Sequence, residues 1–371
     1  MRVGFYAPLK PPDHPVPSGD RLMARLLIEA LGRAGHEVRI MSRFRSRDGA
    51  GDPARQARLA ALGRKLADRL PRGPSPDLWF TFHLYHKAPD LIGPAVATRL
   101  GIPYVVAEAS FAPKQAHGPW AAGHAAVAAA LAQAAAIIGL NPADAACVRP
   151  LLADPGRYHA LPPFLDTAPF ETARGARERT RAELAGTQGL DPGTPWIVAV
   201  AMMRPGDKLA SYRLLGRALR RLLDRPWRLI VIGDGEARDA VVAALGALGR
   251  RVAWLGAQAS DRVAPLVAAA DLLVWPAVNE AWGMALLEAQ AAGLPIVAGR
   301  VGGVPAIVSD GVTGMLTPPG DAQALAGAVA SLLDDPARRG AMGRAALDHI
   351  AQIHGLDAAA RRLDGILRGV A

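Results

Sequence analysis

The chain has 371 residues, of which 51% are hydrophobic and 20% are charged. This composition predicts a packed globular protein long enough for two domains, and it excludes a disordered chain. The single cysteine, Cys147, excludes an internal disulfide framework and suits a reducing compartment. The first apolar run is too short for a signal peptide and is followed at once by Pro11 and Pro12, so the expected location is the cytoplasm.

The net charge of +10 is concentrated near the N-terminus, where residues 1–75 hold 15 Lys and Arg against 7 Asp and Glu. Within this part, residues 54–72 contain six basic residues and one acidic residue, and leucines recur at helical spacing at positions 59, 62, 66 and 70. Two interpretations stay open. The helix covers the protein's own core with its charges in water, or it makes peripheral contact with an anionic membrane, on its inner face.

Short β-branched runs alternate with longer amphipathic stretches along the whole chain. The strands predicted in the first half are 3–7, 38–41, 78–81, 104–107 and 137–140. Between Lys114 and Asp144 no residue is charged, which imitates a membrane span. Because alanine is only weakly hydrophobic and Pro119 interrupts the run, we expect a buried helix over 123–133 instead.

The strands predicted in the second half are 196–201, 228–232, 252–255, 272–274, 295–298 and 314–316, with helical patterns such as 21–34, 212–223 and 322–333 between strands throughout. This alternation predicts an α/β fold of two Rossmann-like, doubly wound parallel sheets facing a central cleft, where ligands bind. The break is expected at 171–195, which is charged and then rich in Gly, Pro and Thr. We therefore expect an N-terminal domain at 1–170, a C-terminal domain at 171–355, and a C-terminal helix at 356–371 that can pack back on the N-terminal domain.

The most informative segment follows the strand predicted at 272–274. Glu280 comes after Pro276 and is expected in a loop, and an apolar helical run then continues until Gly293. The free N–H groups at the start of this helix, together with the helix dipole, make an anion site suited to a diphosphate. Glu288 is the only charged residue on the helix, so it needs a hydrogen-bonding partner such as a pair of ribose hydroxyls. By spacing alone, the two glutamates could equally be a structural pair.

Two other kinds of site are not predicted. Gly233 and Gly235 invite a dinucleotide-binding interpretation, but that fingerprint needs a small residue at the position of Arg238. No D-x-D sequence occurs anywhere in the chain, so metal-dependent binding of a diphosphate is not expected.

The order of these features resembles the donor-site signature of the retaining GT-B glycosyltransferases of family 4, the group 1 glycosyl transferases, whose motif is E-x7-E. The resemblance is specific over 196–335 and looser across the N-terminal half. It implies a metal-independent, hexosyltransferase-type enzyme without a cofactor, which transfers a sugar from a nucleotide-diphospho-sugar to an unidentified glycan or lipid-linked glycan with retention of configuration. The residues that carry the resemblance are Pro276, Glu280, Gly283, Glu288, Gly293, Pro295 and the turn Gly302-Gly303-Val304-Pro305.

The resemblance also implies roles for individual residues. Glu280 and Lys208 are catalytic candidates, because Glu280 would contact the donor sugar and Lys208 would neutralise the diphosphate. Met203 holds the position of an arginine usual in the family, so Arg204, one residue on, is a weaker second cation. The donor-binding residues implied are Glu288, Arg204, Trp282, Gly283, Met284, Ala285, Gly233 and Gly235, with Ser18 and Gly19 from the N-terminal half.

The N-terminal half departs from the family at two positions. Ser18, directly before Gly19, stands where the family's glycine loop commonly has its first glycine. Glu108 ends a strand where many family members have a histidine at the sugar; it is the preferred catalytic substitute, and a purely structural role is equally open. His83 and His86, after the preceding strand, either face the cleft or satisfy loop carbonyls, and two histidines are too few for a metal site.

Other functions stay open on this evidence. A sugar-nucleotide epimerase or a phosphorylase of GT-B fold would use the same cleft. A non-catalytic nucleotide-sugar-binding subunit would be expected to have damaged donor residues, whereas Glu280, Glu288 and Lys208 are all present. No nucleic-acid partner is expected.

Overall fold

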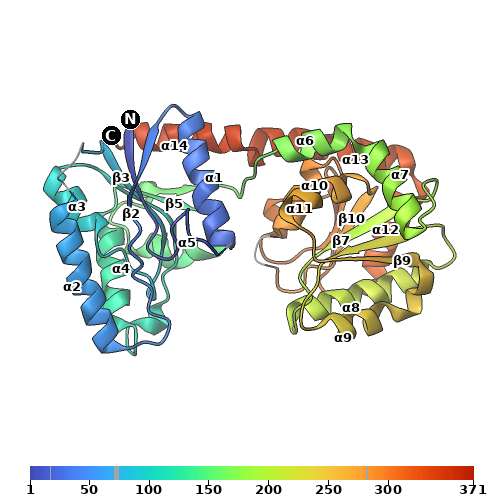
Figure 1. Ribbon diagram of the computed structural model, residues 1–371, viewed down its shortest axis with the longest axis horizontal. Coiled ribbons are helices and arrows are strands. Elements are labelled where there is room, and N and C mark those ends of the chain that lie inside the picture. Colours follow the sequence, from blue (N-terminus) through green and yellow to red (C-terminus); the bar gives the residue numbers. More distant parts are fainter. Residues whose placement is uncertain (17, 71–74, 281–282) are drawn as a thin grey trace. The chain divides into compact units, whose positions relative to one another are not determined.

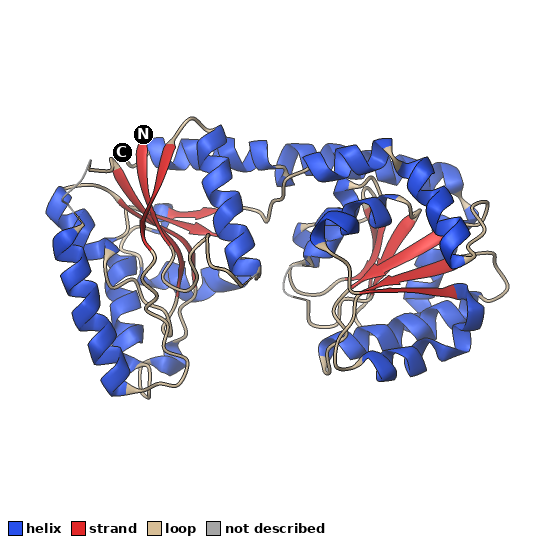
Figure 2. Ribbon diagram, viewed as in Figure 1, coloured by secondary structure: helices blue, strands red, loops and turns tan. Residues whose placement is uncertain are grey.

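The computed structural model describes residues 1–16, 18–70, 75–280 and 283–371. The chain forms two compact units, one of Met1–Pro163 with Leu356–Ala371 and one of Phe164–Gly355. Within the described residues, each unit has a six-stranded parallel sheet with helices on both faces (Figure 1, Figure 2). The predicted α/β class, with two doubly wound parallel sheets, is confirmed.

The first unit has the strand order β2-β1-β3-β4-β5-β6, and its neighbouring strands are parallel. The strands are β1 (Arg2–Tyr6), β2 (Glu37–Ser42), β3 (Leu78–Leu84), β4 (Tyr104–Ala109), β5 (Ala136–Gly139) and β6 (Tyr158–Ala160). The helices are α1 (Gly19–Arg33), α2 (Pro53–Arg69), α3 (Gly93–Leu100), α4 (Ala121–Gln133), α5 (Pro142–Val148) and α14 (Leu356–Arg368). Strand β3 is buried along almost its whole length, as expected for a parallel strand covered on both faces.

The alanine-rich stretch that imitated a membrane span forms α4 and β5. Val127, Ala130 and Leu131 of α4 are buried in the core of the first unit. The predicted helix is confirmed, but only this face of it is buried, and Ala125 and Ala129 are exposed. In the part of the chain that the structure describes, no helix combines the length and the apolar character that a membrane crossing requires.

Helix α14 is far in sequence from the rest of the first unit, yet it packs on α1 (Figure 1). Leu363 and Leu367 are fully buried, and an ion pair of 2.9 Å joins Arg33 to Asp357 across the two helices. The C-terminal residues therefore complete the core of the first unit.

The second unit has the strand order β12-β11-β10-β7-β8-β9, again parallel. The strands are β7 (Trp196–Val200), β8 (Arg228–Ile232), β9 (Val252–Gly256), β10 (Leu272–Trp275), β11 (Ile296–Gly299) and β12 (Gly314–Thr317). The helices are α6 (Ala168–Gly175), α7 (Arg177–Gln188), α8 (Asp207–Leu219), α9 (Arg238–Leu245), α10 (Ser260–Ala268), α11 (Met284–Ala291), α12 (Ala322–Asp334) and α13 (Pro336–His349).

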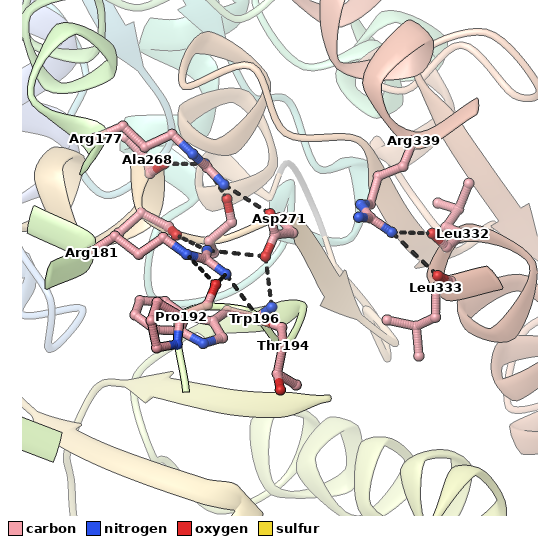
Figure 3. Close-up of polar contacts among 12 residues, drawn as sticks. Arg177, Arg181, Pro192, Thr194, Trp196, Ala268, Asp271, Leu332, Leu333 and Arg339 are labelled. Carbon is pink, nitrogen blue, oxygen red and sulfur yellow. Dashed lines mark hydrogen bonds and ion pairs between the residues drawn. The ribbon is translucent and has the colours of Figure 1, made fainter. Parts of the chain in front are cut away.

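Two arginines of α7 anchor the amino-terminal side of this sheet (Figure 3). Arg181 donates hydrogen bonds to the carbonyls of Pro192 and Thr194, each at 2.9 Å, and forms an ion pair of 3.1 Å with Asp271. Arg177 pairs with the other oxygen of Asp271 at 2.8 Å. The segment expected to be the break between domains is thus fixed to the second unit's sheet. Because these guanidinium groups already bind protein carbonyls and a carboxylate, the cavity of about 420 Å³ beside them is not an open anion site.

Candidate functional site

The loops that follow β7, β8 and β10 lie at one edge of the second unit's sheet. Strand β7 pairs with both β8 and β10, and all three run parallel, so their carboxyl ends meet. In doubly wound sheets this edge is where ligands bind. The sequence-predicted donor residues of the second unit are carried by these loops and by the helices α8 and α11 that follow them.

An ion pair between Lys208 and Glu280 joins two of these loops. Lys208 is in the first turn of α8, and its Nζ lies 2.5 Å from Oε2 of Glu280. Nε1 of Trp275, at the end of β10, donates to the same oxygen at 3.1 Å. The lysine side chain is 30% exposed and that of the glutamate 14%, so the pair is screened from water on most sides. The structure thus brings together two catalytic candidates that are far apart in sequence.

The loop that carries Glu280 has an unusual backbone. Ala277 and Asn279 adopt left-handed conformations, with φ of 58° and 50°, which cost about 1 kcal/mol or more for a residue with a side chain. The amide of Val278 donates to Oγ of Ser211 at 3.0 Å, and Nδ2 of Asn279 donates to Oδ2 of Asp207 at 2.8 Å. These bonds hold the strained loop against α8 and set the position of Glu280.

Helix α11 begins directly after Gly283, near the position predicted from sequence. Gly283 has φ of 70°, and a Cβ there would lie 2.9 Å from Cδ1 of Leu286, so glycine is favoured. Met284 and Ala285 form the first turn and are half-buried, which leaves their N–H groups at the free end of the helix. Trp282, the remaining predicted donor residue here, lies outside the described residues.

Glu288 is half-buried on α11 and has no hydrogen-bond or ion-pair partner among the described residues. Burial raises the pKa of this carboxyl from 4.5 to about 7. The protein partner that a buried carboxylate normally requires is absent from the described chain, and hydroxyl donors of a ligand would fill that role.

Gly233 and Gly235 form the loop after β8 and have φ of 145° and 152°. A Cβ at Gly233 would lie 1.9 Å from the carbonyl oxygen of Ala201, and one at Gly235 would lie 2.4 Å from that of Met203. Both glycines therefore let this loop lie directly on the loop after β7. Their presence is explained by the protein's own packing.

The second predicted cation of this site is not brought to the Lys208–Glu280 pair. Met203, at the position of the arginine expected from the family, is 1% exposed and packs into the core of the second unit. Arg204 points to solvent and makes no side-chain hydrogen bond or ion pair within the described part of the chain. Lys208 is therefore the cation that the loop after β7 contributes.

In the first unit, His83 and Glu108 lie opposite each other on neighbouring strands. Phe82 pairs with Ala107 and Leu84 with Ala109, which places the two residues at the same level of β3 and β4. Both have left-handed backbones, with φ of 62° for His83 and 57° for Glu108. Strain repeated at one level of two paired strands is typical of functional positions.

Helix α1 supplies a carboxylate to this group. Ser18 caps the helix by accepting a hydrogen bond from the amide of Arg21 at 3.3 Å, and Asp20 in the first turn lies 2.9 Å from Nδ1 of His83. A Cβ at Gly19 would meet no atom within 4 Å, so packing does not require glycine there. The predicted loop residues Ser18 and Glu108 thus belong to one neighbourhood.

The titratable side chains of this neighbourhood change one another's pKa values. Burial raises the pKa of Glu108, and the nearby imidazole of His83 partly counteracts that rise. Burial alone would lower the pKa of His83, but its hydrogen bond to Asp20 and the charge of Glu108 raise it above the usual value. Burial also raises the pKa of Asp144 at the start of α5, opposed by a hydrogen bond from Ser110. The group can hold a proton near neutral pH.

Sequence reasoning did not select His83 or Asp20 as site residues. It noted His83 together with His86, but the structure separates them: the ring of His86 packs on Trp120, 5.8 Å away, beside an apolar cavity of about 300 Å³. Only the pairing register of β3 and β4 distinguishes the two histidines, and no local sequence pattern gives that register. Within the described ranges, no three His, Cys, Asp or Glu side chains are placed to hold a metal ion.

Comparison with known proteins matches part of the second unit to a known family. Residues 194–335 match the family described as "Glycosyl transferases group 1". The D-inositol 3-phosphate glycosyltransferase of Rhodococcus opacus (strain B4) is 35% identical over 213 residues, which cover 54% of this chain and 46% of that protein. The protein of the same name from Corynebacterium glutamicum (strain R) is 32% identical over 209 residues, covering 53% and 48%. The chain thus spans about half the length of the curated relatives it matches.

Solved structures share the fold along the whole chain. Sucrose-phosphate synthase from Thermosynechococcus elongatus superposes with a TM-score of 0.70 at 21% identity, covering 100% of this chain and 98% of that one. The Anabaena protein Alr3699/HepE in complex with UDP also gives 0.70, at 17% identity and complete coverage of both chains. WaaG, a glycosyltransferase involved in lipopolysaccharide biosynthesis, gives 0.64 at 18% identity. The fold is GT-B, and residues 194–335 match the group 1 glycosyl transferases.

Proposed function

We propose that this chain, which carries a group 1 glycosyl transferase domain, is a glycosyltransferase that moves a sugar from a nucleotide-diphospho-sugar to an acceptor with retention of configuration. The observation that carries the proposal is the Lys208–Glu280 pair of 2.5 Å, at the carboxyl edge of the sheet, together with Glu288 on the helix that follows the same loop, which has no partner among the described residues. A cation, a sugar-binding carboxylate and a ribose-binding carboxylate are together what such a donor requires.

The donor binds to the second unit in this proposal. The diphosphate accepts hydrogen bonds from the N–H groups of Met284 and Ala285 and from the ammonium of Lys208. Lys208 exchanges its ion pair with Glu280 for one with the phosphate. Glu280 then accepts hydrogen bonds from the sugar, and Glu288 accepts them from the ribose hydroxyls. The raised pKa of Glu288, about 7, supports this role because hydroxyl donors would stabilise its ionised form.

In the reaction, the bond between the anomeric carbon and the diphosphate oxygen breaks, and the acceptor oxygen attacks from the same face. The departing phosphate oxygen takes the acceptor's proton. Negative charge grows on the diphosphate, where Lys208 and the start of α11 stabilise it. Glu108 is the catalytic group that we assign to the first unit, and the imidazole of His83, held by Asp20, counteracts part of the rise that burial causes in the pKa of this carboxyl.

The acceptor binds to the first unit in this proposal. It is a glycan, a lipid-linked glycan or a phosphorylated polyol, such as the inositol phosphate in the name of the D-inositol 3-phosphate glycosyltransferases. The protein is placed in the cytoplasm, with peripheral contact of α2 with an anionic membrane as a further part of the proposal. Helix α2 supports it through the exposed side chains of Arg58, Arg64 and Lys65.

A panel of nucleotide-sugars tests donor binding directly. UDP-, GDP- and ADP-sugars are screened by thermal shift in the presence of EDTA, and the best donor is titrated by calorimetry. Lys208→Gln is expected to weaken donor binding about tenfold or more, because a charge-assisted contact to phosphate is lost. Lys114→Gln, an exposed lysine of the first unit, is the matched control. Failure of every nucleotide-sugar to bind, or equal binding by Lys208→Gln and Lys114→Gln, would reject the proposal.

A further inference from the structure

A second polar cavity lies in the first unit, at the carboxyl ends of β1, β2 and β3. It has a volume of about 400 Å³. The loop after β1, the segment after β2, the residue after β3 and the first turn of α1 each contribute to its walls. The polar residues of these walls are Lys10, His14, Arg45, Arg47, Tyr85 and Asp20.

The charge of this basic cavity is strongly unbalanced. Its walls contain three permanently cationic side chains and one carboxylate, and that carboxylate, Asp20, is already bound to His83 at 2.9 Å. The ammonium of Lys10 and the guanidinium of Arg47 make no hydrogen bond or ion pair with any other described residue. Positive charge collected in a concave wall attracts anions more strongly than the same charge spread over a surface.

The walls are held in place by bonds between the loops. The hydroxyl of Tyr6 donates to the carbonyl of Phe44 at 3.0 Å, and Nε of Arg45 donates to that of Leu9 at 2.9 Å. On the other side of the β1 loop, Nε of Arg25 donates to the carbonyl of Pro12 at 2.7 Å. The loops that form the walls and the guanidinium of Arg45 are therefore fixed before a ligand enters, which reduces the entropic cost of binding.

His14 and Arg45 point to an acceptor between them. The amide of Val16 donates to Nδ1 of His14 at 3.2 Å, which leaves Nε2 as the ring nitrogen that carries a proton. That Nε2 lies 3.3 Å from Nη1 of Arg45, which also carries protons. Two donors at this separation are satisfied together by a shared oxygen acceptor, and an anionic oxygen would also compensate the arginine charge.

We infer that the basic cavity binds the phosphate of a phosphomonoester acceptor, so that the acceptor substrate of this enzyme is a phosphorylated compound. This inference rests on the proposed glycosyl transfer. A phosphate dianion matches a site with a planar guanidinium, a second guanidinium and an ammonium better than a single carboxylate does. Asp20 belongs both to the cavity wall and to the group of His83 and Glu108, so a phosphate held here would keep the rest of a small acceptor beside that group.

Inorganic phosphate is the first probe, titrated by calorimetry in the presence of a saturating amount of the nucleotide that the protein binds best. The double variant Lys10→Gln, Arg47→Gln is expected to bind phosphate about tenfold more weakly or worse than the wild type, with the affinity for the nucleotide unchanged. The control is Arg39→Gln, an exposed arginine of β2 outside the cavity, which should bind phosphate as the wild type does. Circular dichroism and a melting curve verify that the variants fold.

Two outcomes would overturn the inference: equal phosphate affinity in the double variant and Arg39→Gln, or a parallel loss of nucleotide affinity, which would assign the cavity to the donor's diphosphate. Glycerol 3-phosphate and vesicles containing phosphatidic acid then distinguish a soluble from a lipid-borne phosphomonoester. The double variant could lose phosphate binding while the wild type binds no nucleotide-sugar. That result would establish phosphate as the ligand of the cavity and reject only the proposed glycosyl transfer.

Discussion

Glu288 combines burial with the lack of a protein partner within the described residues. Burial raises the pKa of its carboxyl to about 7, so near neutral pH a substantial fraction of the group is protonated. Ribose hydroxyls that donate hydrogen bonds to this carboxylate would favour the ionised form. If the nucleotide binds as proposed, its binding is therefore expected to be coupled to loss of a proton from Glu288.

Glu288→Gln is expected to weaken nucleotide binding by about 1–3 kcal/mol, because a neutral amide is a poorer acceptor for two hydroxyls. The wild type should also release a proton on binding near pH 7, and Glu288→Gln should not. Calorimetry in buffers of different ionisation enthalpy measures both quantities. Unchanged affinity together with unchanged proton release would show that Glu288 does not contact the nucleotide.

The same substitution should stabilise the protein at high pH. The pKa of Glu288 is about 7 in the folded protein and near 4.5 in the unfolded chain, so the folded state binds more protons between those values. The free energy of unfolding therefore falls as pH rises from about 4.5 to 7. Above pH 7, Glu288→Gln should be more stable than the wild type by about 1–3 kcal/mol, and near pH 4.5 the two should agree.

Melting curves measured from pH 4.5 to pH 8.5 test this dependence. Glu183→Gln, which removes an exposed carboxylate of α7, is the control and should follow the wild type at every pH. A difference between Glu288→Gln and the wild type that is constant with pH would contradict the raised pKa.

At the scale of residues, sequence reasoning selected single candidates better than their partners. The E-x7-E spacing drew attention to Glu280, but its pairing with Lys208 depends on how two loops meet in space. Glu108 was selected through a family position, whereas its neighbour His83 is identified only by the register of two strands. Contacts between distant segments depend on tertiary packing, which no local pattern contains.

Among the elements, α7 is fixed to the start of the second unit's sheet in large part by one side chain, that of Arg181. Arg181 is 8% exposed and stacks over the ring of Trp196 at 4.0 Å while it binds Pro192, Thr194 and Asp271. Removing such a cation leaves several buried acceptors and a carboxylate with fewer partners.

Arg181→Met, which keeps an unbranched apolar stem but removes the guanidinium group, is expected to lower the free energy of unfolding by about 2–4 kcal/mol. Arg179→Met on the exposed face of the same helix is the control and should change stability by less than about 0.5 kcal/mol. Urea denaturation followed by circular dichroism gives both values. Equal midpoints for the two variants would mean that the arginine contacts do not stabilise the second unit.

Helix α2 covers its own unit and also keeps a basic outer face. Gly63 and Ala67 are buried, and a Cβ at Gly63 would lie 2.6 Å from Cβ of Leu91, so the helix packs tightly there. The expected leucine stripe only partly faces the core: Leu66 and Leu70 pack against it, and Leu62 is 45% exposed. Arg72, the last basic residue of the segment, lies outside the described residues.

If α2 also contacts an anionic membrane, replacing Arg55, Arg58, Arg64 and Lys65 with glutamine should reduce binding to vesicles of acidic lipid. Binding of the wild type should fall steeply with salt, because surface charges are screened. The control replaces four exposed arginines of the second unit, Arg213, Arg217, Arg220 and Arg221, and so removes the same charge. Equal loss in both variants, or equal binding to neutral vesicles, would leave α2 as a solvated helix.

The ends of the strands depend more on which side chains are buried than on the local sequence pattern. Strand β3 continues past residue 81 because Phe82 and Leu84 are buried, although His83 between them adopts a left-handed conformation. Strand β6 was not predicted, since its three residues contain a single buried side chain, Tyr158. A strand that short is defined by its neighbour β5 rather than by its own sequence.

For the whole molecule, the class of fold was predictable from the sequence. Which residues belong to each unit was less predictable. The repeated alternation of apolar runs and amphipathic stretches is enough to predict two parallel sheets. That α14 completes the first unit follows from the packing of Leu363 and Leu367 near α1, a contact between the two ends of the chain. The residues 164–170, assigned from sequence to the N-terminal domain, lie in the second unit.

Turnover of the best-binding nucleotide-sugar shows whether this chain transfers a sugar. Wild type and Lys208→Gln are incubated with that donor, with and without phosphorylated and unphosphorylated sugars and polyols, and the released nucleotide and the products are followed by mass spectrometry and proton NMR. We expect nucleotide release by the wild type that depends on an acceptor, a product with the donor's anomeric configuration, and a rate about tenfold or more lower for Lys208→Gln. Nucleotide release of equal rate without any acceptor, or conversion of the donor into an epimer, would contradict it.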